Sequence, residues 1–411
     1  MNLAIPEALK PYAGRITDID SHEHMPAQLW IEAFGEVARP IMEMTMEQQA
    51  RNKNSSNVPG YVGDTAEISP QSLWFNKGPT APGAVDLERR IEVMDMMAID
   101  RQLLFPTSIG LWASVLYGAP KDGPLFKKFG AGTYDLAKRL FDAYAEWAVG
   151  VARDKRRIVP VAGIYGDTPE ELTAMARRQI DRGFGAILMS SGRMPGDVSP
   201  AANALDPLYA LLAEAKVPLN FHIGGELLFL GSSRWGQAEA FSGYKVSEET
   251  SLDPWRLSVL HLAPQNFVAT MVTGGVFDRH PTLRVGVQEY TAHWIGPLAR
   301  FLDLWHDNNH SIHDKQFSQG HSGKQLPMLP SEYINRNIRV SPFDFEPVDE
   351  YIEMYGLTDT YCFASDYPHV EGGKNPMGRF SSALERLGPA TMEKFFVENG
   401  TWLLPVRSAA H

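Results

Sequence analysis

Eight short apolar segments, each followed by a stretch with helical character, recur along this chain and constrain its fold more than any other feature. They are rich in β-branched residues and nearly continuously apolar rather than alternating, which is typical of parallel strands buried on both faces. The predicted strands are Arg15–Asp20, Arg101–Thr107, Arg157–Ile164, Phe184–Ser190, Val217–His222, Leu283–Glu289, Asn337–Ser341 and Thr360–Asp366. The pattern predicts an α/β fold built on a parallel sheet.

The segments between these strands favour helices. Residues 87–98 keep one face apolar at helical spacing, and Thr168, followed by a proline and two glutamates, predicts a capped helix start. Eight strand–helix units indicate a (β/α)₈ barrel. A doubly wound open sheet is the main alternative, but no glycine-rich phosphate-binding turn follows the first strand.

The strand–helix rhythm also decides the domain organisation. Length alone, at about 150 residues per domain, suggests two or three domains, but the rhythm predicts a single barrel domain over residues 1–411. Two stretches interrupt it, at 31–85 after the first strand and at 306–330 after the sixth helix. Because segments that follow barrel strands lie on the catalytic face, we expect 31–85 to be a lid or an oligomer contact. We expect 306–330 to be an inserted loop.

Charge and cysteine content exclude several classes of protein. Asp and Glu outnumber Lys and Arg by 49 to 38, with no basic run, so the concentrated positive face that nucleic acids need is missing. The one cysteine, Cys362, excludes a disulfide framework and a cysteine-based metal cluster. No leader-like segment and no apolar window of roughly 18 residues is present. We therefore expect a cytoplasmic, soluble protein that binds neither nucleic acid nor membrane.

The first predicted strand ends in a histidine-rich motif, Asp20-Ser21-His22-Glu23-His24. Because residues i and i+2 of a strand point to the same side, His22 and His24 are expected to project together into the barrel mouth. Two imidazoles in that position can chelate a divalent ion, for which Zn²⁺ is the commonest choice. Taken alone, such a triplet is more often a pair of hydrogen-bonded loop histidines.

Further polar residues end later strands. His222 ends the fifth, Glu289 the sixth and Asp366 the eighth. In a closed barrel the eighth strand adjoins the first and the fifth lies across the mouth, so His22, His24, His222 and Asp366 can converge on one ion. Three histidines and one carboxylate leave a position for water, as in catalytic zinc sites.

Four segments carry a family resemblance: DSHEHMP at 20–26, NFH at 220–222, GGVFDRHPTLRV at 274–285 and SDYPH at 365–369. With them the chain resembles the amidohydrolase superfamily, in the amidohydrolase-related (amidohydrolase 2) branch around aminocarboxymuconate-semialdehyde decarboxylase. The resemblance implies a distorted TIM barrel in which His22, His24, His222 and Asp366 bind one divalent metal. No lysine ends the fourth strand, where binuclear relatives carry a carboxylated lysine, so a mononuclear site is implied.

Glu289 departs from the decarboxylase pattern, in which a histidine ends the sixth strand. Three roles stay open for it: orienting a metal-binding histidine, acting as a general base, or anchoring a loop. His293, one helical turn later, is a candidate for the missing imidazole, as a proton shuttle or simply as a packing histidine. His369, three residues after Asp366, is a candidate substrate contact.

We predict a metal-dependent hydrolase in which metal-activated water attacks a small oxygenated, carboxylated aromatic or ring-cleavage compound. The cleaved bond is left open among C–C, C–O and C–N. Asp366 is predicted to orient the water and accept its proton, and Glu289 or His293 to return a proton to the leaving group. The expected cofactor is one Zn²⁺, with Mn²⁺ as the alternative.

Two other functions stay open. The main alternative is metal-dependent non-oxidative decarboxylation, and the third is a metal-stabilised binding protein without turnover. In each case the partner is a small molecule, and the resemblance also implies a homodimer or a higher homo-oligomer.

Overall fold

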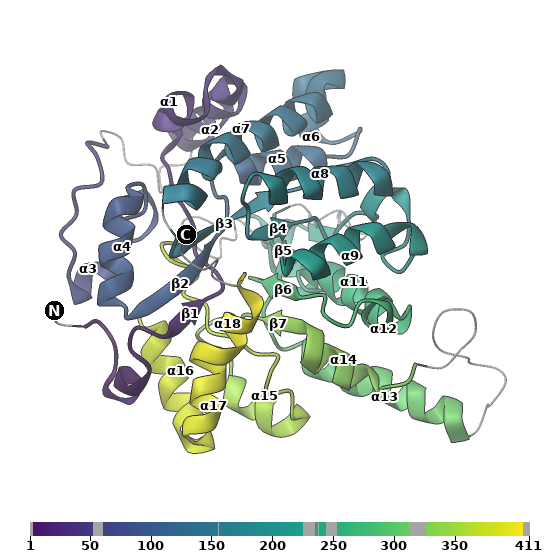
Figure 1. Ribbon diagram of the computed structural model, residues 1–411. Coiled ribbons are helices and arrows are strands. Elements are labelled where there is room, and N and C mark those ends of the chain that lie inside the picture. Colours follow the sequence, from purple (N-terminus) through teal and green to yellow (C-terminus); the bar gives the residue numbers. More distant parts are fainter. Residues whose placement is uncertain are drawn as a thin grey trace.

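Seven parallel strands pair side by side in chain order, from β1 to β7, and the sheet curls into a barrel (Figure 1). The computed structural model describes residues 3–51, 61–154, 156–224, 235–236, 238–243, 253–311 and 326–405. The strands are β1 (Ile16–Asp18), β2 (Ile99–Leu104), β3 (Ile158–Gly163), β4 (Ala186–Leu188), β5 (Leu219–His222), β6 (Val285–Gln288) and β7 (Ile338–Val340). Seven of the eight predicted strands are thus confirmed, with β2 beginning two residues earlier than expected.

The eighth predicted strand, 360–366, is not a regular strand, but it occupies the eighth position of the ring. On one side Val340 N donates to Thr360 O (2.8 Å) and Cys362 N to Val340 O (3.0 Å). On the other side Ile19 N donates to Phe363 O (3.2 Å). The segment therefore joins β7 to β1, which confirms a distorted TIM barrel and excludes the doubly wound alternative.

Helices cover the outside of this ring, and most of them lie in the chain between one strand and the next. They are α1 (Trp30–Phe34), α2 (Arg39–Arg51), α3 (Pro70–Phe75), α4 (Leu87–Met96), α5 (Ile109–Tyr117), α6 (Pro124–Phe129), α7 (Thr133–Asp154), α8 (Pro169–Asp181), α9 (Asp206–Ala215), α10 (Pro254–Val259), α11 (Leu262–Thr273), α12 (Val276–Arg279), α13 (Ile295–Ser311), α14 (Pro330–Asn337), α15 (Val348–Tyr355), α16 (Pro376–Leu384), α17 (Pro389–Glu393) and α18 (Asn399–Leu403). The predicted start of α8 is confirmed: the Thr168 side chain accepts a hydrogen bond from Glu171 N (3.3 Å).

The barrel interior is a packed apolar core that leaves one end available for chemistry. Side chains from alternate strand positions fill it, among them Ile19, Leu103, Val161 and Cys362. α18 contacts β1 and β7, and Arg284, directly before β6, donates to Leu404 O (3.1 Å). α18 and Leu404 thus cover the amino ends of these strands, and functional groups are expected at the carboxyl ends.

The predicted insertion 31–85 contains α2 and α3 and most of α1, which packs on α7 through Phe34 and Trp147 (ring centroids 5.7 Å apart; Figure 1). Its last part returns to the carboxyl end of the barrel, where Gly78 N donates to Pro368 O (2.9 Å) and His24 N to Ala84 O (2.9 Å). A role for this segment as a lid or an oligomer contact stays a prediction.

The predicted loop 306–330 begins as helix instead, because α13 continues to Ser311. His306 is buried within it, with Nε2 3.2 Å from Leu326 O, and residues 312–325 lie outside the described part. Across the described residues, none of the helices combines the length and the apolarity required to cross a bilayer.

Candidate metal centre

Five polar side chains from four positions of the barrel meet at its carboxyl end. They are Asp20 and His22 after β1, His222 at the end of β5, Glu289 after β6 and Asp366 in the eighth position. Asp366 N donates to Asp20 O (2.8 Å), so the closure of the ring brings together carboxylates that are far apart in sequence. We call these five residues the central cluster.

The central cluster is tight. His22 Nε2 lies 3.3 Å from Asp20 Oδ1 and 3.5 Å from Asp366 Oδ1. His222 Nε2 lies 3.3 Å from the same Asp20 oxygen and 3.1 Å from Glu289 Oε2. The ligand-type atoms of Asp20, His22, His222 and Glu289 all lie within 4.8 Å of one another.

Most of these atoms are buried without a directed hydrogen bond among the described residues. This is so for Asp20 Oδ1, Nε2 of His22 and of His222, and both carboxylate oxygens of Asp366. Buried polar atoms are nearly always satisfied, so several unsatisfied ones at one point need an explanation. Their convergence fits a ligand that they share rather than bonds to one another.

Two members of the cluster have left-handed backbone conformations that non-glycine residues rarely adopt. The φ angles are +60° at Glu289 and +49° at Asp366. Such residues cost free energy and persist where the surroundings hold them. Here Glu289 N donates to Ser341 Oγ (3.2 Å), so the neighbouring strand end fixes the turn that carries this carboxylate.

The charges of the cluster do not balance on their own. Burial raises the pKa of Glu289, and burial together with the Glu289 carboxylate raises the pKa of Asp366. Burial opposes the charge of His222, but the Asp20 and Glu289 carboxylates outweigh it and raise that pKa. Three buried carboxylates cannot all ionise without added positive charge, which a divalent cation supplies.

The chemistry of the donors also fits such an ion. Two imidazole nitrogens with carboxylate oxygens form a mixed set that binds first-row divalent metals. His222 Nδ1 lies 3.0 Å from Ile223 O, and His22 Nδ1 lies 2.9 Å from Thr107 Oγ1. A proton on each Nδ1 makes these hydrogen bonds and leaves the lone pair of Nε2 facing the cluster.

Glu23, from the same motif, braces the cluster rather than joining it. Its buried carboxylate accepts hydrogen bonds from Thr107 N (2.9 Å), Ser108 N (2.8 Å), Ser108 Oγ (2.6 Å) and Met25 N (3.1 Å). Since Thr107 contacts His22, this carboxylate fixes the loop after β2 against the cluster.

A buried arginine holds the backbone of the same motif. Arg90 Nη2 donates to His22 O (2.7 Å) and its Nε to Gly83 O (2.7 Å). Its guanidinium lies 4.9 Å from the centroid of the Tyr367 ring. Arg90 thus ties the end of the 31–85 insertion to the strand end that carries His22.

The structure does not bring His24 into the cluster, although the sequence predicts it as a metal ligand. The extended pairing of β1 continues through His22, which bridges to Phe105. At His24 the backbone turns to pair with Ala84, so strand alternation no longer applies. The His24 ring instead meets His369 edge-on, with centroids 5.4 Å apart. Its Nδ1 is also buried without a hydrogen-bond partner among the described residues, so metal binding by His24 stays a prediction.

Asp20 is the cluster member that sequence reasoning missed. It precedes His22 by two residues, and the same alternation that was applied to His22 and His24 places Asp20 and His22 on one side. The same i, i+2 spacing, counted back from His22 to the last residue of the predicted strand, could therefore have identified Asp20.

His293 does not face the cluster either. Thr291, with φ of +61°, turns the chain after Glu289, and His293 Nδ1 lies 2.7 Å from Thr291 Oγ1. The His293 ring packs edge-on against His261, with centroids 4.6 Å apart. A role for His293 in proton transfer has no contact with the cluster to support it.

His369 lies beside the cluster, where a substrate contact was predicted. Its ring stacks on His22 with centroids 3.9 Å apart, and Nδ1 lies 3.2 Å from Asp366 Oδ1. Nε2 lies 3.0 Å from the Thr107 hydroxyl. One hydroxyl therefore links His22 and His369, and a second group of ligand-type atoms comprises His22, Glu289, Asp366 and His369.

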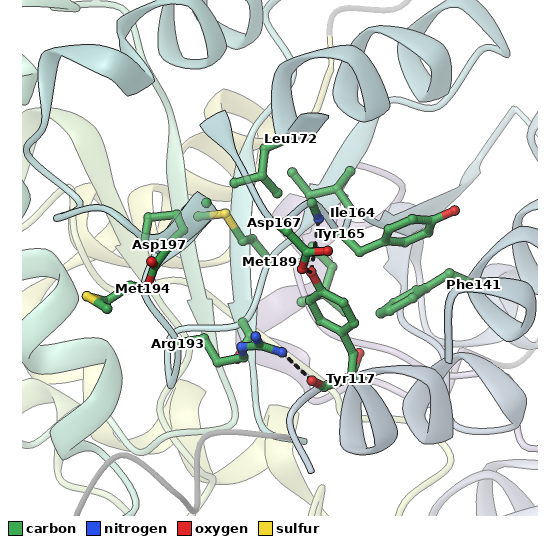
Figure 2. Close-up of a pocket in the computed structure, with 16 residues that line it drawn as sticks. Tyr117, Phe141, Ile164, Tyr165, Asp167, Leu172, Met189, Arg193, Met194 and Asp197 are labelled. Atoms are coloured by element: carbon green, nitrogen blue, oxygen red, sulfur yellow. Dashed lines mark hydrogen bonds between the residues drawn. The ribbon is translucent and has the colours of Figure 1, made fainter. Parts of the chain in front are cut away.

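A cavity of about 410 Å³ opens beside the cluster (Figure 2). It lies at the ends of β3 and β4, where Ile164, Leu188 and Met189 form its apolar floor and Tyr117 of α5 forms a wall. Two hollows that reach the cluster itself are far smaller, about 10 Å³ at Glu289 and Asp366 and about 20 Å³ at His222. Among the described residues, the larger cavity thus lies to one side of the charged groups.

Comparison with known proteins gives a family match and a set of structural neighbours. The family model described as Amidohydrolase matches residues 126–406, about two thirds of the chain. No curated protein matches the chain. The family match begins after the motif at 20–24, so the geometry alone joins that motif to the rest of the cluster.

Three solved structures illustrate the shared fold. An amidohydrolase from Mycobacterium avium subsp. paratuberculosis K-10 aligns with TM-score 0.62 and 20% identity, covering 95% of this chain and 98% of its own. A second structure is a 5-carboxyvanillate decarboxylase from Novosphingobium aromaticivorans DSM 12444, complexed with manganese and 4-hydroxy-3-methoxy-5-nitrobenzoic acid. It aligns with TM-score 0.55 and 17% identity, covering 98% of this chain and 99% of its own. A third is a dihydroxybenzoic acid decarboxylase from Polaromonas sp. JS666, with manganese and 2-nitroresorcinol. It aligns with TM-score 0.52 and 13% identity, covering 94% of this chain and 96% of its own.

Proposed function

This chain belongs to the amidohydrolase family, and on that premise we propose that it is a divalent-metal-dependent enzyme that removes CO₂ from a small hydroxylated aromatic acid. The observation that carries the proposal is the central cluster, in which buried nitrogen and oxygen atoms converge without directed hydrogen bonds. Two structural neighbours are aromatic acid decarboxylases with bound manganese, which supports decarboxylation more than the hydrolysis favoured by the sequence.

The proposed ligands are Asp20, His22, His222 and Asp366, with Asp20 in place of the predicted His24. This exchange replaces a nitrogen donor by an oxygen donor. Carboxylate-rich sites suit Mn²⁺ better than all-imidazole sites do, so we propose Mn²⁺ ahead of Zn²⁺. A cation held there supplies positive charge that offsets the carboxylate and phenolate oxygens of the substrate.

The groups around the cluster can manage the proton that decarboxylation requires. The substrate ring carbon takes a proton, the bond from that carbon to the carboxylate then breaks, its electrons return to the ring, and CO₂ leaves. Asp366 has two oxygens without directed partners among the described residues, so one can serve as a ligand while the other holds the proton. His369 Nδ1, 3.2 Å away, can replace that proton.

Glu289 and the surrounding burial serve this chemistry in a different way. Glu289 Oε2 lies 3.1 Å from His222 Nε2, so we assign it to hold that imidazole and to share proton transfer with Asp366. The side chain of His22 is 1% exposed and that of Asp366 is 8% exposed. Water is thus largely kept from the ring carbon, and charge interactions in the site are strengthened.

Isotope labelling separates decarboxylation from hydrolysis. Manganese-loaded protein is incubated with hydroxybenzoates and carboxyvanillates in D₂O and, separately, in H₂¹⁸O. Decarboxylation gives CO₂ and one deuterium on the carbon that lost it, with no ¹⁸O in the aromatic product. Entry of ¹⁸O into an organic product without CO₂ release would instead restore the hydrolase assignment.

A further inference from the structure

The cavity beside the central cluster has a lining that differs from the cluster in chemistry. Its walls are mainly aromatic and aliphatic, and the rings of Tyr117, Phe141 and Tyr165 stand 5.5–6.3 Å apart (Figure 2). Ligand sites in barrels of this kind combine an apolar lining with a few placed polar groups. The lining also includes the charged side chains of Asp167, Asp197 and Arg193, so this composition suits a planar apolar group that carries a polar end.

The cavity adjoins the cluster through a common wall. Ser114, Leu188, Met189 and Ser190 line both the cavity and the small hollow that reaches His222. The cavity and the hollow at His222 therefore lie side by side along these four residues.

Its size exceeds what a single ring requires. An engineered cavity of roughly 150 Å³ is enough to bind benzene, whereas this one has about 410 Å³. The hollows at the cluster are only about 10 and 20 Å³. Those hollows have room for little more than the reacting carboxylate of an acid. The ring that carries this carboxylate would take up only part of the larger cavity, and a second ring fits into the rest.

The aromatic wall is held in place before any ligand binds. The Tyr117 hydroxyl donates to Asp167 Oδ1 (2.9 Å) and accepts from Gly166 N (3.2 Å). The other oxygen of Asp167 accepts from Lys138 Nζ (3.2 Å). A wall fixed in this way binds a rigid group with little additional ordering cost.

Arg193 at the mouth of the cavity uses only part of its guanidinium for a hydrogen bond within the protein. Arg193 is exposed, its guanidinium lies 4.5 Å from the Tyr117 ring centroid, and Nη1 donates to Tyr117 O. Within the described ranges it forms no ion pair, although the Asp167 carboxylate lies close enough to interact with its charge. Arginine binds carboxylates in a two-pronged geometry, and stacking on Tyr117 orients it for one.

We propose that this cavity is a second substrate subsite, which takes a planar apolar group attached to the acid at the cluster and binds a distal carboxylate through Arg193. The proposal rests on the proposed function for the reacting end. It narrows the substrate class to aromatic acids with a second ring or a comparable conjugated arm, ending in an anionic group.

Three probes separate the contributions: 2-hydroxybenzoate, 5-phenyl-2-hydroxybenzoate, and 5-(4-carboxyphenyl)-2-hydroxybenzoate. Binding to the manganese-loaded protein is measured by calorimetry, and CO₂ release is followed in parallel. We expect the second ring to tighten binding at least about tenfold and the distal carboxylate to add about another tenfold, as for one charge-assisted contact. Equal affinity for all three acids would overturn the subsite.

Three variants locate the effect. Arg193→Gln should remove the gain from the distal carboxylate, and Met194→Trp, at a rim position that is 61% exposed, should weaken both two-ring acids by filling the cavity. Arg177→Gln, an exposed arginine of α8 outside the lining, is the matched control and should change neither gain. A gain that survives both cavity variants would place the second ring elsewhere and overturn the proposal.

The two readouts keep the proposals apart. Tight, Arg193-dependent binding without CO₂ from any acid supports the subsite and counts against the decarboxylase. CO₂ from 2-hydroxybenzoate, with no tighter binding of the two-ring acids, supports the decarboxylase and overturns the subsite.

Discussion

Two groups of histidines lie near the carboxyl ends of the strands, and their surroundings differ. In the central cluster, the imidazoles of His22 and His222 have carboxylate oxygens 3.1–3.5 Å away. In the second group, which we call the histidine pair, His261 and His293 contact each other, and His293 also contacts the Thr291 hydroxyl. No carboxylate of the described residues lies at ion-pair distance from either member of the pair. Converging carboxylates, more than histidines, therefore distinguish the candidate metal centre.

The histidine pKa values are shifted in opposite directions in the two groups. The carboxylates around His222 raise its pKa against the effect of burial. In the pair, burial and the neighbouring His293 lower the pKa of His261 to about 4, and burial lowers that of His293. The pair is thus built to stay neutral, whereas the cluster gathers charge that a cation can offset.

Replacing one carboxylate of the cluster should have the largest effect. We expect Asp20→Asn to lose bound metal and to lower kcat/KM more than about 100-fold, because even partners of metal ligands cost 10–100-fold when removed. His293→Asn, in the pair, should keep its metal and stay within about threefold of the wild type. Metal analysis and steady-state kinetics on both variants make the comparison.

His24→Asn belongs in the same experiment. It should retain metal if Asp20 is the ligand. Metal lost from the His24 variant and kept by Asp20→Asn would restore the ligand set predicted from the sequence.

Metal addition should stabilise the fold through the cluster alone. A ligand present at about 100 times its Kd stabilises the native state by about 2.7 kcal/mol. We therefore expect Mn²⁺ to raise the Tm of chelator-treated protein by a few degrees. The same rise is expected for His261→Gln, but none for Asp20→Asn. An equal rise in all three proteins would mean that the metal binds elsewhere.

The sequence predicted the barrel and four members of the cluster because their placement follows from strand ends alone. The four, which each end a strand position that the order of strands brings to one mouth, are His22, His222, Glu289 and Asp366. Alternation does not place His24 in the cluster, because the chain leaves the strand there to pair with Ala84. The position of His293 one helical turn after Glu289 does not bring it to the cluster either, because Thr291 turns the chain in a left-handed conformation.

Other features depended on partners that no local pattern reveals. Glu23 acts through Ser108, which is 85 residues later, and Arg193 meets Tyr117 at a distance of 76 residues. The cavity is formed where α5 and the ends of β3 and β4 come together. Such sites are products of tertiary packing, so strand and helix periodicity could place their elements but not their contacts.

Each histidine group is held by a buried glutamate, which offers a matched test of positioning. Glu23 accepts from Thr107 N and Ser108 N beside the cluster. Glu346 accepts from Ala292 N (2.9 Å) and Phe343 N (2.8 Å) beside the pair. Both Glu23→Gln and Glu346→Gln should lower the unfolding free energy by about 1–3 kcal/mol, since an amide cannot accept every bond.

Activity should separate the two glutamates. Glu23→Gln should lower kcat about tenfold through Thr107, which contacts both His22 and His369, whereas Glu346→Gln should stay within about threefold. Denaturant unfolding and kinetics at one temperature give both numbers. Equal losses of activity would show that general destabilisation, rather than positioning, explains the effect of Glu23.

The smallest expected effect is the contribution of the histidine pair to stability against acid. Because the pKa of His261 is lowered to about 4 in the folded protein, the unfolded chain, with an ordinary value near 6.5, binds more protons between these two values. The contribution is therefore fully present above about pH 6.5 and is lost as pH falls toward 4. His261→Gln should reduce the acid-induced loss of unfolding free energy by less than about 1 kcal/mol, since the side chain is only half-buried. Denaturant unfolding from pH 7 to pH 4.5 measures it, and a variant that loses stability as steeply as the wild type would show that the pair accepts protons without cost.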